Sequence, residues 1–297
     1  MTDLLRPAEP IEWPAAFAAC ASFTFDVDAE SAALSGSWDM AQRMSVMSHQ
    51  AYGPLVGVPR ILDILDRHGV RSTFFVPGWT AERHPGTVRD IAAAGHEIAH
   101  HGYLHESPLG RSVTEQADFI DRGIDALDAI AGVRPVGYRA PLWELTYDAP
   151  ALLADRGFLY ESSLMDADWP YELAVDENRS LVEIPIQWAL DDWEQYAYVP
   201  GVHEAGIIES PHKVEELWRS EYDGIVAVGG SFVLTNHPFL TGRPGRAAVL
   251  DRLVADAVSD PRVWVAAMQE IAEHVRSLNL QPRAVTRPTA TDNSSSP

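Results

Sequence analysis

Two short stretches carry side chains that could bind a metal ion and move protons. Residues 22–28 read Ser-Phe-Thr-Phe-Asp-Val-Asp, a pattern typical of a strand that ends on two carboxylates. Because side chains alternate between the faces of a strand, Asp26 and Asp28 should project to the same side. Two carboxylates held this close favour a bound cation, which neutralises their charge.

Residues 95–106, which read Gly-His-Glu-Ile-Ala-His-His-Gly-Tyr-Leu-His-Glu, supply imidazoles for the same site. His101 and His105 have the His-x-x-x-His spacing that puts two side chains on one face of a helical turn. One Asp and two His form the ligand set of an open catalytic metal site. His96 and His100 have the same spacing, so spacing alone does not choose the pair. A polar strand end with a surface histidine cluster is the simpler alternative.

Alternating strand and helix patterns run along the chain and predict one α/β domain, a (β/α) barrel with a parallel sheet. Asp26 with Asp28, His101 with His105, Arg139 and His237 each follow a predicted strand. Such strand ends converge on one face of a barrel, where active sites are built. We expect residues 1–21 to form an N-terminal arm, 22–280 the barrel, and 281–297, rich in Thr, Ser and Pro, a disordered tail. Residues 29–52 show no clear period and predict a long loop.

Composition excludes several classes of partner. The net charge of −21 argues against nucleic acid and against anionic membrane surfaces. Cys20 is the sole cysteine, which excludes an intramolecular disulfide and a cysteine-based zinc cluster. No apolar run approaches the roughly 18 residues that a membrane span requires. The uncharged run 14–25 follows acidic rather than basic residues, so we interpret it as a lead-in to the first strand and expect a cytoplasmic protein.

Taken together, these residues resemble the polysaccharide deacetylase family (carbohydrate esterase family 4, with the NodB-like domain). The resemblance runs from Ser22 to about Leu278 in the family's motif order. Its five motifs correspond to Thr24-Phe-Asp-Val-Asp28, Gly95-His-Glu97 with His101-Gly-Tyr-Leu-His105, Arg139-Ala-Pro141, approximately Asp166-Ala-Asp168-Trp169, and Leu234-Thr-Asn-His237-Pro238. The resemblance implies a distorted (β/α) barrel that carries one divalent metal ion, commonly zinc.

Carried over residue by residue, the resemblance implies roles for six side chains. Asp28, His101 and His105 would be the metal ligands, which also favours this histidine pair over His96 and His100. Asp26 would be the catalytic base, held by Arg139, and His237 the general acid. We expect the pocket to be lined by residues that follow or flank these motifs: Glu30, Leu142 (through its backbone N–H), Trp143, Asp168, Trp169, Trp188 and Asp191. Asp168 is also a candidate for orienting His237.

The chain departs from the family's usual pattern at its first motif. The two aspartates are separated by Val27 where the family has adjacent ones, and this version with Leu190-Asp-Asp192 and Gly242-Arg-Pro-Gly-Arg246 is similar to a branch of peptidoglycan-deacetylase-like, allantoinase-like and cyclic imide hydrolase proteins. Members of that branch act on small cyclic or linear amides, often as homotetramers. We therefore expect a homo-oligomeric metal-dependent hydrolase of a non-peptide carbon–nitrogen bond, with an N-acetylated sugar or glycan, or a small cyclic amide or imide, as substrate. A catalytically inactive relative that binds a sugar or amide is the alternative.

Overall fold

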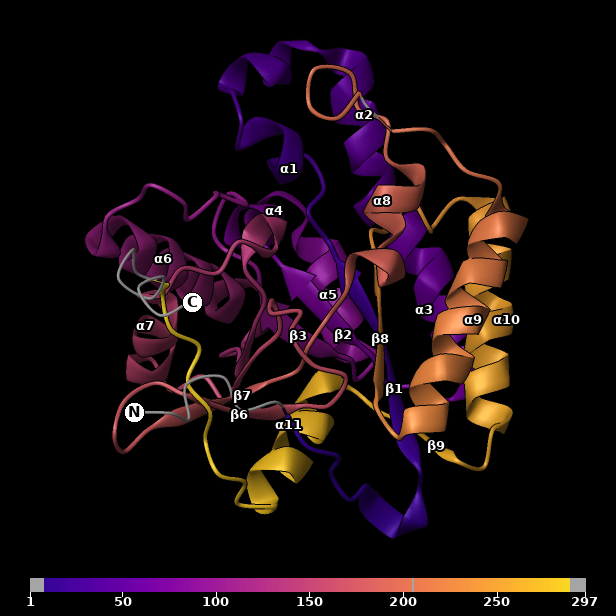
Figure 1. Ribbon diagram of the computed structural model, residues 1–297. Helices are drawn as coiled ribbons and strands as arrows, with labels where there is room; N and C mark the ends of the chain where they lie inside the picture. The colour runs from indigo at the N-terminus through magenta and orange to yellow at the C-terminus, as the bar shows by residue number, and fades with distance from the viewer. Residues whose placement is uncertain (1–7, 205, 289–297) are drawn as a thin grey trace, which may run out of the picture.

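The computed structural model describes residues 8–204 and 206–288 (Figure 1). A curled sheet forms the centre of the molecule, with strand order β6-β7-β5-β4-β3-β2-β1-β8, and β9 pairs with β1. The strands are β1 (Ala19–Asp26), β2 (Thr73–Val76), β3 (Glu97–His100), β4 (Gly137–Tyr138), β5 (Tyr160–Glu161), β6 (Tyr171–Ala174), β7 (Ser180–Glu183), β8 (Ser231–Asn236) and β9 (Val263–Val265). All neighbours are parallel except β6 and β7, so the predicted single-domain α/β fold with a barrel-like sheet is confirmed.

The strand β1 occupies the middle of the sheet because both of its faces are apolar or small enough to be covered. All of its residues are buried, and it pairs with β2, β8 and β9. Parallel strands that are covered on both faces carry few large polar residues, and before Asp26 this strand has only apolar residues and the small Ser22 and Thr24. Its carboxyl end carries Asp26, and the chain continues into Asp28 while the Val27 N–H donates to the Phe75 carbonyl (2.8 Å). The strand end is therefore held in register where the predicted chemistry begins.

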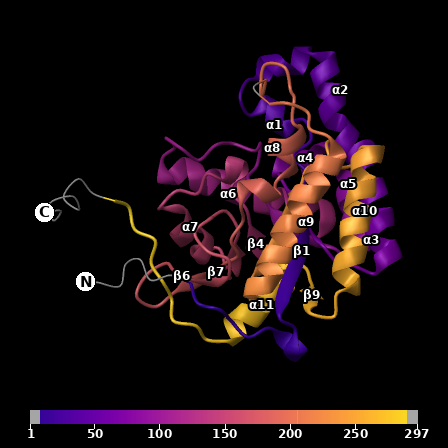
Figure 2. The ribbon, with the colours of Figure 1, turned by 45° about the vertical axis from the view of Figure 1, so that its right-hand side comes forward.

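Eleven α-helices are described, and most of them cover the sheet. They are α1 (Ser31–Leu34), α2 (Met44–Tyr52), α3 (Val58–His68), α4 (Gly78–Arg83), α5 (Pro85–Ala93), α6 (Val113–Ala131), α7 (Ala149–Asp155), α8 (Asp192–Tyr196), α9 (Pro211–Val228), α10 (Pro244–Ser259) and α11 (Met268–Ser277). Figures 1 and 2 show α3, α9 and α10 side by side on one flank, with α6 and α7 on the other. Among the described residues, no helix is both long and apolar enough to span a membrane.

Inside the curl, α11 closes the end of the sheet opposite the predicted site. Its apolar residues Met268, Ile271 and Val275 pack with inward-facing residues of six strands, such as Tyr160 and Val182. A buried carboxylate fixes this closure: Glu97 accepts from the Thr73 hydroxyl (2.6 Å), the Tyr160 hydroxyl (2.8 Å) and the Gln269 N–H (2.9 Å). The other end of the curl stays available for the site.

Several sequence predictions about the elements are wrong in detail. Residues 29–52 are not one long loop, since they contain α1, a 3₁₀ turn and α2, which rise beyond the sheet in Figure 1. The antiparallel strand β6 was not predicted, and β1 begins three residues before Ser22. Part of the expected tail is ordered, because the Arg283 N–H donates to Glu172 and its carbonyl accepts from Ala174 at the edge of β6. Residues 1–7 of the arm and 289–297 of the tail lie outside the described residues.

Candidate active site

Asp26 and Arg139 form a buried ion pair at the ends of β1 and β4. The Arg139 Nη1 lies 2.8 Å from Asp26 Oδ1 and 3.0 Å from Thr24 Oγ1. The Arg139 Nε donates to the Ser162 carbonyl (3.1 Å), and its guanidinium lies 4.1 Å from the centre of the Phe75 ring. The guanidinium is thus fixed on every side, and it aims one N–H at the carboxylate.

The environment of Asp26 keeps its carboxylate charged. Burial by itself would raise the pKa of Asp26, but the Arg139 guanidinium and the nearby imidazoles of His101 and His237 lower it below its ordinary value. Opposite charges at this distance favour the ionised form. An ionised carboxylate beside the predicted metal ligands is suited to accept a proton.

The predicted ligands Asp28, His101 and His105 come together, and their ligand atoms all lie within 4.8 Å of one another. The Nε2 of His101 is 3.4 Å from Asp28 Oδ1, and that of His105 is 3.6 Å from Asp28 Oδ2. The spacing argument assumed a helical turn, and this is wrong: residues 101–108 form an irregular segment in which His105 has a φ of 58°. Gly102 (φ 74°) allows the turn, since a Cβ there would lie 2.9 Å from the Pro141 ring.

The donor set fits a divalent metal. Neither Asp28 carboxylate oxygen has a hydrogen-bond partner among the described residues, although the side chain is 1% exposed. The Nδ1 of His101 lies 2.8 Å from the Arg139 carbonyl and must donate to it, which leaves Nε2 as the unprotonated ligand atom. Burial lowers the pKa of His105 to about 4, so this ring is neutral at pH 7. A divalent metal ion requires such buried oxygens without partners and ring nitrogens that are free to bind it.

His237 follows β8 and faces the same centre, 3.5 Å from Asp28 Oδ2 through its Nε2. Its Nδ1 is bonded to Asp192 Oδ1 (2.7 Å), which also accepts the His237 N–H (2.8 Å). The other oxygen of Asp192 accepts from the Thr241 N–H (3.1 Å) and the Thr241 hydroxyl. Burial by itself would lower the pKa of His237, but Asp191, Asp192 and Asp28 raise it well above its ordinary value.

Asp191, Asp192 and His237 form a second group with ligand atoms within 4.8 Å of one another. Its atoms are already engaged, since Asp192 accepts the four hydrogen bonds just described and Asp191 Oδ1 accepts the Trp193 N–H (2.8 Å). Burial and the neighbouring Asp192 raise the pKa of Asp191 to about 8. We therefore infer that the two aspartates orient His237 and that this group is not a second metal site.

A small pocket of about 140 Å³ joins these groups. Besides the predicted catalytic and ligand residues, it is lined by Leu142, Trp143, Trp188, Asp191, Trp193 and Glu194. The Trp143 and Trp188 rings stack with their centres 4.4 Å apart and form one wall. Leu142 and Trp143 have φ values of 59° and 55°, a strained turn at the pocket. The Leu142 N–H has no backbone acceptor among the described residues, so it is available to a ligand.

Comparison with known proteins agrees with this geometry. The model of the polysaccharide deacetylase family matches residues 43–160. The peptidoglycan deacetylase-like protein FGM2 of Gibberella zeae is 30% identical over 263 residues, which are 77% of this chain and 78% of its own. The chain belongs to the polysaccharide deacetylase family. Membership makes it a hydrolase that acts on carbon–nitrogen bonds other than peptide bonds.

Other members of the polysaccharide deacetylase family align along nearly the whole chain. A peptidoglycan deacetylase of Helicobacter pylori is 27% identical over 277 residues, 85% of this chain and 94% of its own. A crystal structure from Mycobacterium smegmatis, assigned to the polysaccharide deacetylases, superposes with a TM-score of 0.95 at 57% identity and covers 96% of this chain and 99% of its own. PuuE allantoinase shares the fold, with a TM-score of 0.79 at 24% identity and coverage of 90% and 93%.

The family's fourth motif is not where the sequence suggested. Asp168 and Trp169 lie at the opposite end of β8 from His237: the Asp168 carbonyl accepts the Ser231 N–H (2.9 Å), and Trp169 Nε1 donates to the Gly229 carbonyl (3.0 Å). The predicted contact between Asp168 and His237 is therefore wrong, and Asp192 makes it. The adjacent acids of Leu190-Asp-Asp192 were the available signal for this residue.

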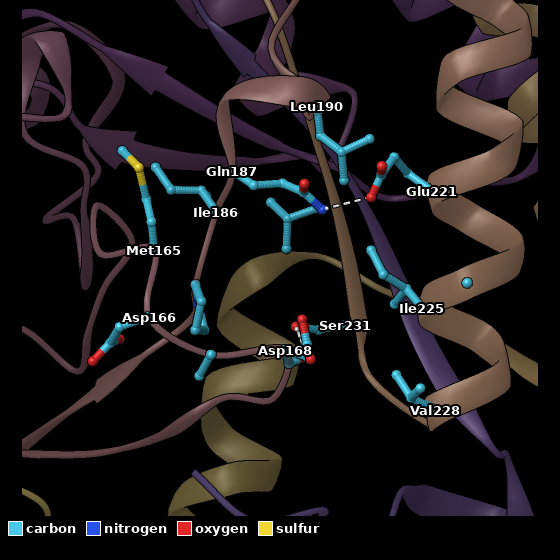
Figure 3. A pocket seen from close by; sticks show the side chains of 14 residues that line it. Met165, Asp166, Asp168, Ile186, Gln187, Leu190, Glu221, Ile225, Val228 and Ser231 are labelled. Atoms are coloured by element: carbon cyan, nitrogen blue, oxygen red, sulfur yellow. Dashed lines mark hydrogen bonds between the residues drawn. The ribbon is translucent and has the colours of Figure 1, made fainter. Parts of the chain in front are cut away.

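A larger cavity of about 550 Å³ lies apart from the catalytic residues, between the segment that follows β7, the helix α9 and the strand β8. Figure 3 shows Asp168 and Ser231 at one end and the Gln187–Glu221 hydrogen bond (3.2 Å) across it. None of the predicted catalytic or ligand residues lines it. Glu30 also lies off the active-site pocket, because its carboxylate bonds to His84 (2.7 Å). A choice by cavity volume alone would have placed the active site at this larger cavity, away from the catalytic residues.

Proposed function

We propose that this chain is a metal-dependent amidohydrolase that removes the acetyl group from an N-acetylated amino sugar. The observation that carries the proposal is the placement of the Asp28, His101 and His105 ligand set between two oriented groups. The Asp26 carboxylate, held by Arg139, lies 3.8 Å from His101 Nε2, and the Nε2 of His237, whose ring is held by Asp192, lies 3.5 Å from Asp28 Oδ2. Amide hydrolysis needs a proton acceptor for water and a proton donor for the leaving nitrogen, and Asp26 and His237 supply one each.

Asp28, His101 and His105 would hold the metal, which when bound lowers the pKa of a water molecule and polarises the substrate carbonyl. The chain's own residues then move the protons. Asp26 accepts a proton from the attacking water, since its carboxylate lies beside the ligands and is kept ionised by Arg139. The free N–H of Leu142 lies at the pocket and is placed to donate to an oxyanion there.

His237 supplies the proton to the leaving nitrogen. Its Nδ1–H donates to Asp192, so its Nε2 is the atom that faces the pocket and carries the transferable proton. The arrangement resembles other catalytic histidines, in which a carboxylate fixes the tautomer and the orientation of the ring. Because Asp192 is held by four hydrogen bonds, the imidazole has little freedom to turn away from the substrate.

The shape of the pocket supports a substrate whose reacting amide is compact. At about 140 Å³ the pocket takes in an acetamido group or one small ring. A sugar chain would extend across the mouth, over the Leu142 and Trp188 side chains, which are 54% and 47% exposed. Relatives named as peptidoglycan and chitin deacetylases support an N-acetylated glycan as the leading substrate class.

A small cyclic amide or imide is the second candidate. The stacked Trp143 and Trp188 rings offer a flat apolar wall to a planar ring, and PuuE allantoinase shares the fold. Water attack on a ring carbonyl and proton delivery to the ring nitrogen use the same Asp26 and His237, so only the binding surface would differ. A cytoplasmic location and a homo-oligomeric assembly, a tetramer by family resemblance, stay predictions.

Proton NMR of the zinc-loaded protein tests both candidates in one sample. The sample contains two substrates, an oligomer of N-acetylglucosamine and succinimide. Release of acetate would identify a glycan deacetylase, and formation of succinamate would identify a cyclic-imide hydrolase. The Asp26→Asn substitution should abolish turnover. Elemental analysis should show that the metal stays bound in this variant. Loss of the metal in that variant would show that Asp26 is a ligand. Stoichiometric metal with no turnover on a broad panel of amides would instead support an inactive binding relative.

A further inference from the structure

A basic pocket outside the active site lies where α2, α8 and the start of α10 meet. Its volume is about 280 Å³, and its walls include His49, Tyr196, Tyr198, Arg243 and Arg246. It shares no lining residue with the catalytic pocket. Two arginines and a histidine around one small cavity stand out in a chain with a net charge of −21. Arg243 and Arg246 belong to the Gly-Arg-Pro-Gly-Arg stretch, which has no part in the proposed reaction.

The two guanidinium groups are fixed in place without a carboxylate partner. Arg243 lies 3.5 Å from the centre of the Tyr52 ring and donates to the Phe239 carbonyl (3.3 Å). Arg246 lies 4.2 Å from the centre of the Tyr196 ring and donates to the Leu240 carbonyl (3.3 Å). Neither lies within ion-pair distance of a described carboxylate, although the nearby Asp192 carboxylate favours the charged form of Arg246. Ring stacking and one carbonyl each orient these groups and leave most of their N–H donors open.

The amino-terminal end of α10 faces the same cavity. This helix runs for 16 residues, and no side chain caps it. Pro244 has no N–H, so the first free amide of the helix belongs to Gly245, which lines the pocket. A Cβ built on Gly245 would meet no atom within 4 Å, so a ligand can approach the backbone there. The Gly245 amide and the dipole of the helix start both favour an anion, whereas the Arg246 N–H already donates to the Arg243 carbonyl (3.0 Å).

A buried hydroxyl gives an independent indication that a ligand belongs here. Tyr196 lines the pocket and is 1% exposed, and its hydroxyl has no hydrogen-bond partner among the described residues. Burial raises the pKa of Tyr196, so the phenol keeps its proton and acts as a donor. A buried donor without an acceptor is costly and uncommon. An acceptor-only group with several oxygens would satisfy it together with both guanidinium groups.

We propose that this pocket binds the phosphate group of a small molecule or free phosphate. Arginine forks, a helix start and a hydroxyl donor are the recurring partners of phosphate oxygens. The apolar side chains of Leu240 and Ile208 also line the cavity, so they would contact an organic body if the phosphate carries one. The site lies next to the catalytic centre, because α8 starts at Asp192, which holds His237, and ends at Tyr196.

Isothermal titration of the zinc-loaded full-length protein with inorganic phosphate and with glycerol phosphate tests this proposal. Wild type should bind saturably at one site, and the Arg243→Gln, Arg246→Gln double variant should lose at least tenfold in affinity. Tyr196→Phe keeps the ring under Arg246 and removes only the hydroxyl, and it should weaken binding about tenfold. Tighter binding of glycerol phosphate would identify an organic phosphate as the ligand, whereas equal affinities would identify free phosphate.

Two controls separate this site from other phosphate binding. Arg89→Gln removes an exposed arginine whose Nε donates to the Ile130 carbonyl, far from the pocket, and should leave the affinity unchanged. Asp28→Asn disables the metal site and should also keep phosphate binding. Binding that disappears in Asp28→Asn but persists in the double variant would place phosphate on the metal and overturn the proposal. An absence of saturable binding in wild type would overturn it too. If the double variant fails to fold, the phosphate affinity of Tyr196→Phe becomes the test, and an unchanged affinity in that variant would overturn the proposal.

Discussion

The carboxylate of Asp192 determines how His237 presents its ring. It accepts from the His237 N–H and Nδ1–H on one oxygen and from the Thr241 N–H and hydroxyl on the other. In Asp192→Asn an NH₂ group would face one of these pairs of donors, so the ring would lose its orientation. We expect turnover to fall about 100-fold with little change in metal content. Steady-state kinetics and elemental analysis measure the two quantities.

Asp168→Asn is the matched control for this change. The sequence analysis named Asp168 for the role that Asp192 has in the structure, but the described contacts of Asp168 at the far end of β8 run through its backbone carbonyl. We expect Asp168→Asn to keep wild-type turnover. A loss of turnover that is equal in both variants would show that an acid-to-amide change perturbs the fold in general and not the orientation of His237.

The residues that follow strands could be predicted because a parallel sheet gathers its strand ends, whatever the loops do. Asp26, Asp28, Arg139 and His237 were found in this way. Asp192 could not be chosen from its neighbour Asp191, because the choice depends on how the chain turns from the segment beside β8 into α8. The spacing of His101 and His105 correctly predicted that the two imidazoles lie together. The predicted helical turn between them is wrong, because the segment is irregular.

At the scale of elements, the contact between α6 and the ligand segment depends on a missing side chain. A Cβ at Gly123 would lie 2.1 Å from His100 Nε2 and 2.8 Å from the Gly102 carbonyl oxygen. We therefore expect Gly123→Ala to push α6 away, to lower the free energy of unfolding by about 1–3 kcal/mol, and to weaken metal binding. Urea denaturation and a competition titration with a chelator measure these effects.

Gly224→Ala provides the comparison for that prediction. Gly224 also lies within a helix, α9, but a Cβ there would meet nothing within 4 Å. Alanine should therefore stabilise the protein by roughly 0.5–1 kcal/mol through helix propensity alone. If both substitutions change the stability in the same direction, the close approach of α6 does not explain the presence of Gly123.

Two buried carboxyl groups on β5 and β7 couple the stability of the sheet to pH. Glu161 and Glu183 are paired across these strands, and both are fully buried. Burial raises the pKa of Glu161, and burial together with the Glu161 carboxylate raises that of Glu183. The folded chain thus holds protons that the unfolded chain has lost above about pH 4.5, so stability should fall as the pH rises from there.

Glu183→Gln should reduce this loss, because a neutral amide replaces one of the two competing acids. We expect the variant to be more stable than wild type at about pH 8 and to show a smaller decline in stability between about pH 5 and 8. Urea denaturation across this range measures it. Glu216→Gln, an exposed change on α9, should leave the slope as in wild type. A Glu183→Gln variant that is less stable at pH 8 would contradict the assignment.

Elements with a clear period or with residues that cap or break a helix could be predicted from the sequence, and elements that depend on long-range pairing could not. The capping box of Ser112 and Glu115 and the left-handed Gly132 bound α6, and both are residue patterns that mark helix ends in a sequence. Strand β6 has no pattern of its own, because its place is set by antiparallel pairing with β7 and by Arg283 from the end of the described chain. Residues 29–52 became helical through tertiary contacts, such as the bond from Arg43 to the Pro200 carbonyl (2.6 Å).

At the scale of the whole molecule, the curled sheet gathers four buried aspartates at one end. Asp26, Asp28, Asp191 and Asp192 lie around the same centre in a chain that is already strongly acidic. The sequence predicted this gathering because the strand ends of a barrel converge. It did not predict that the edge strands β6 and β8 stay unpaired with each other, so that only an isolated bridge from Asp191 to Thr235 joins the segment after β7 to β8.

Metal binding should therefore be part of the protein's stability. Both Asp28 oxygens are buried without a hydrogen-bond partner in the described chain, and a bound metal ion would satisfy them. A metal that binds only the folded chain adds about 2.7 kcal/mol when its free concentration is 100-fold above Kd. We expect chelation to lower the melting temperature of wild type by several degrees and to leave that of Asp28→Asn almost unchanged, because the asparagine carries no charge to compensate. Calorimetry with and without chelator measures both shifts; a wild type that is insensitive to chelation would show that the ligand set does not hold a metal.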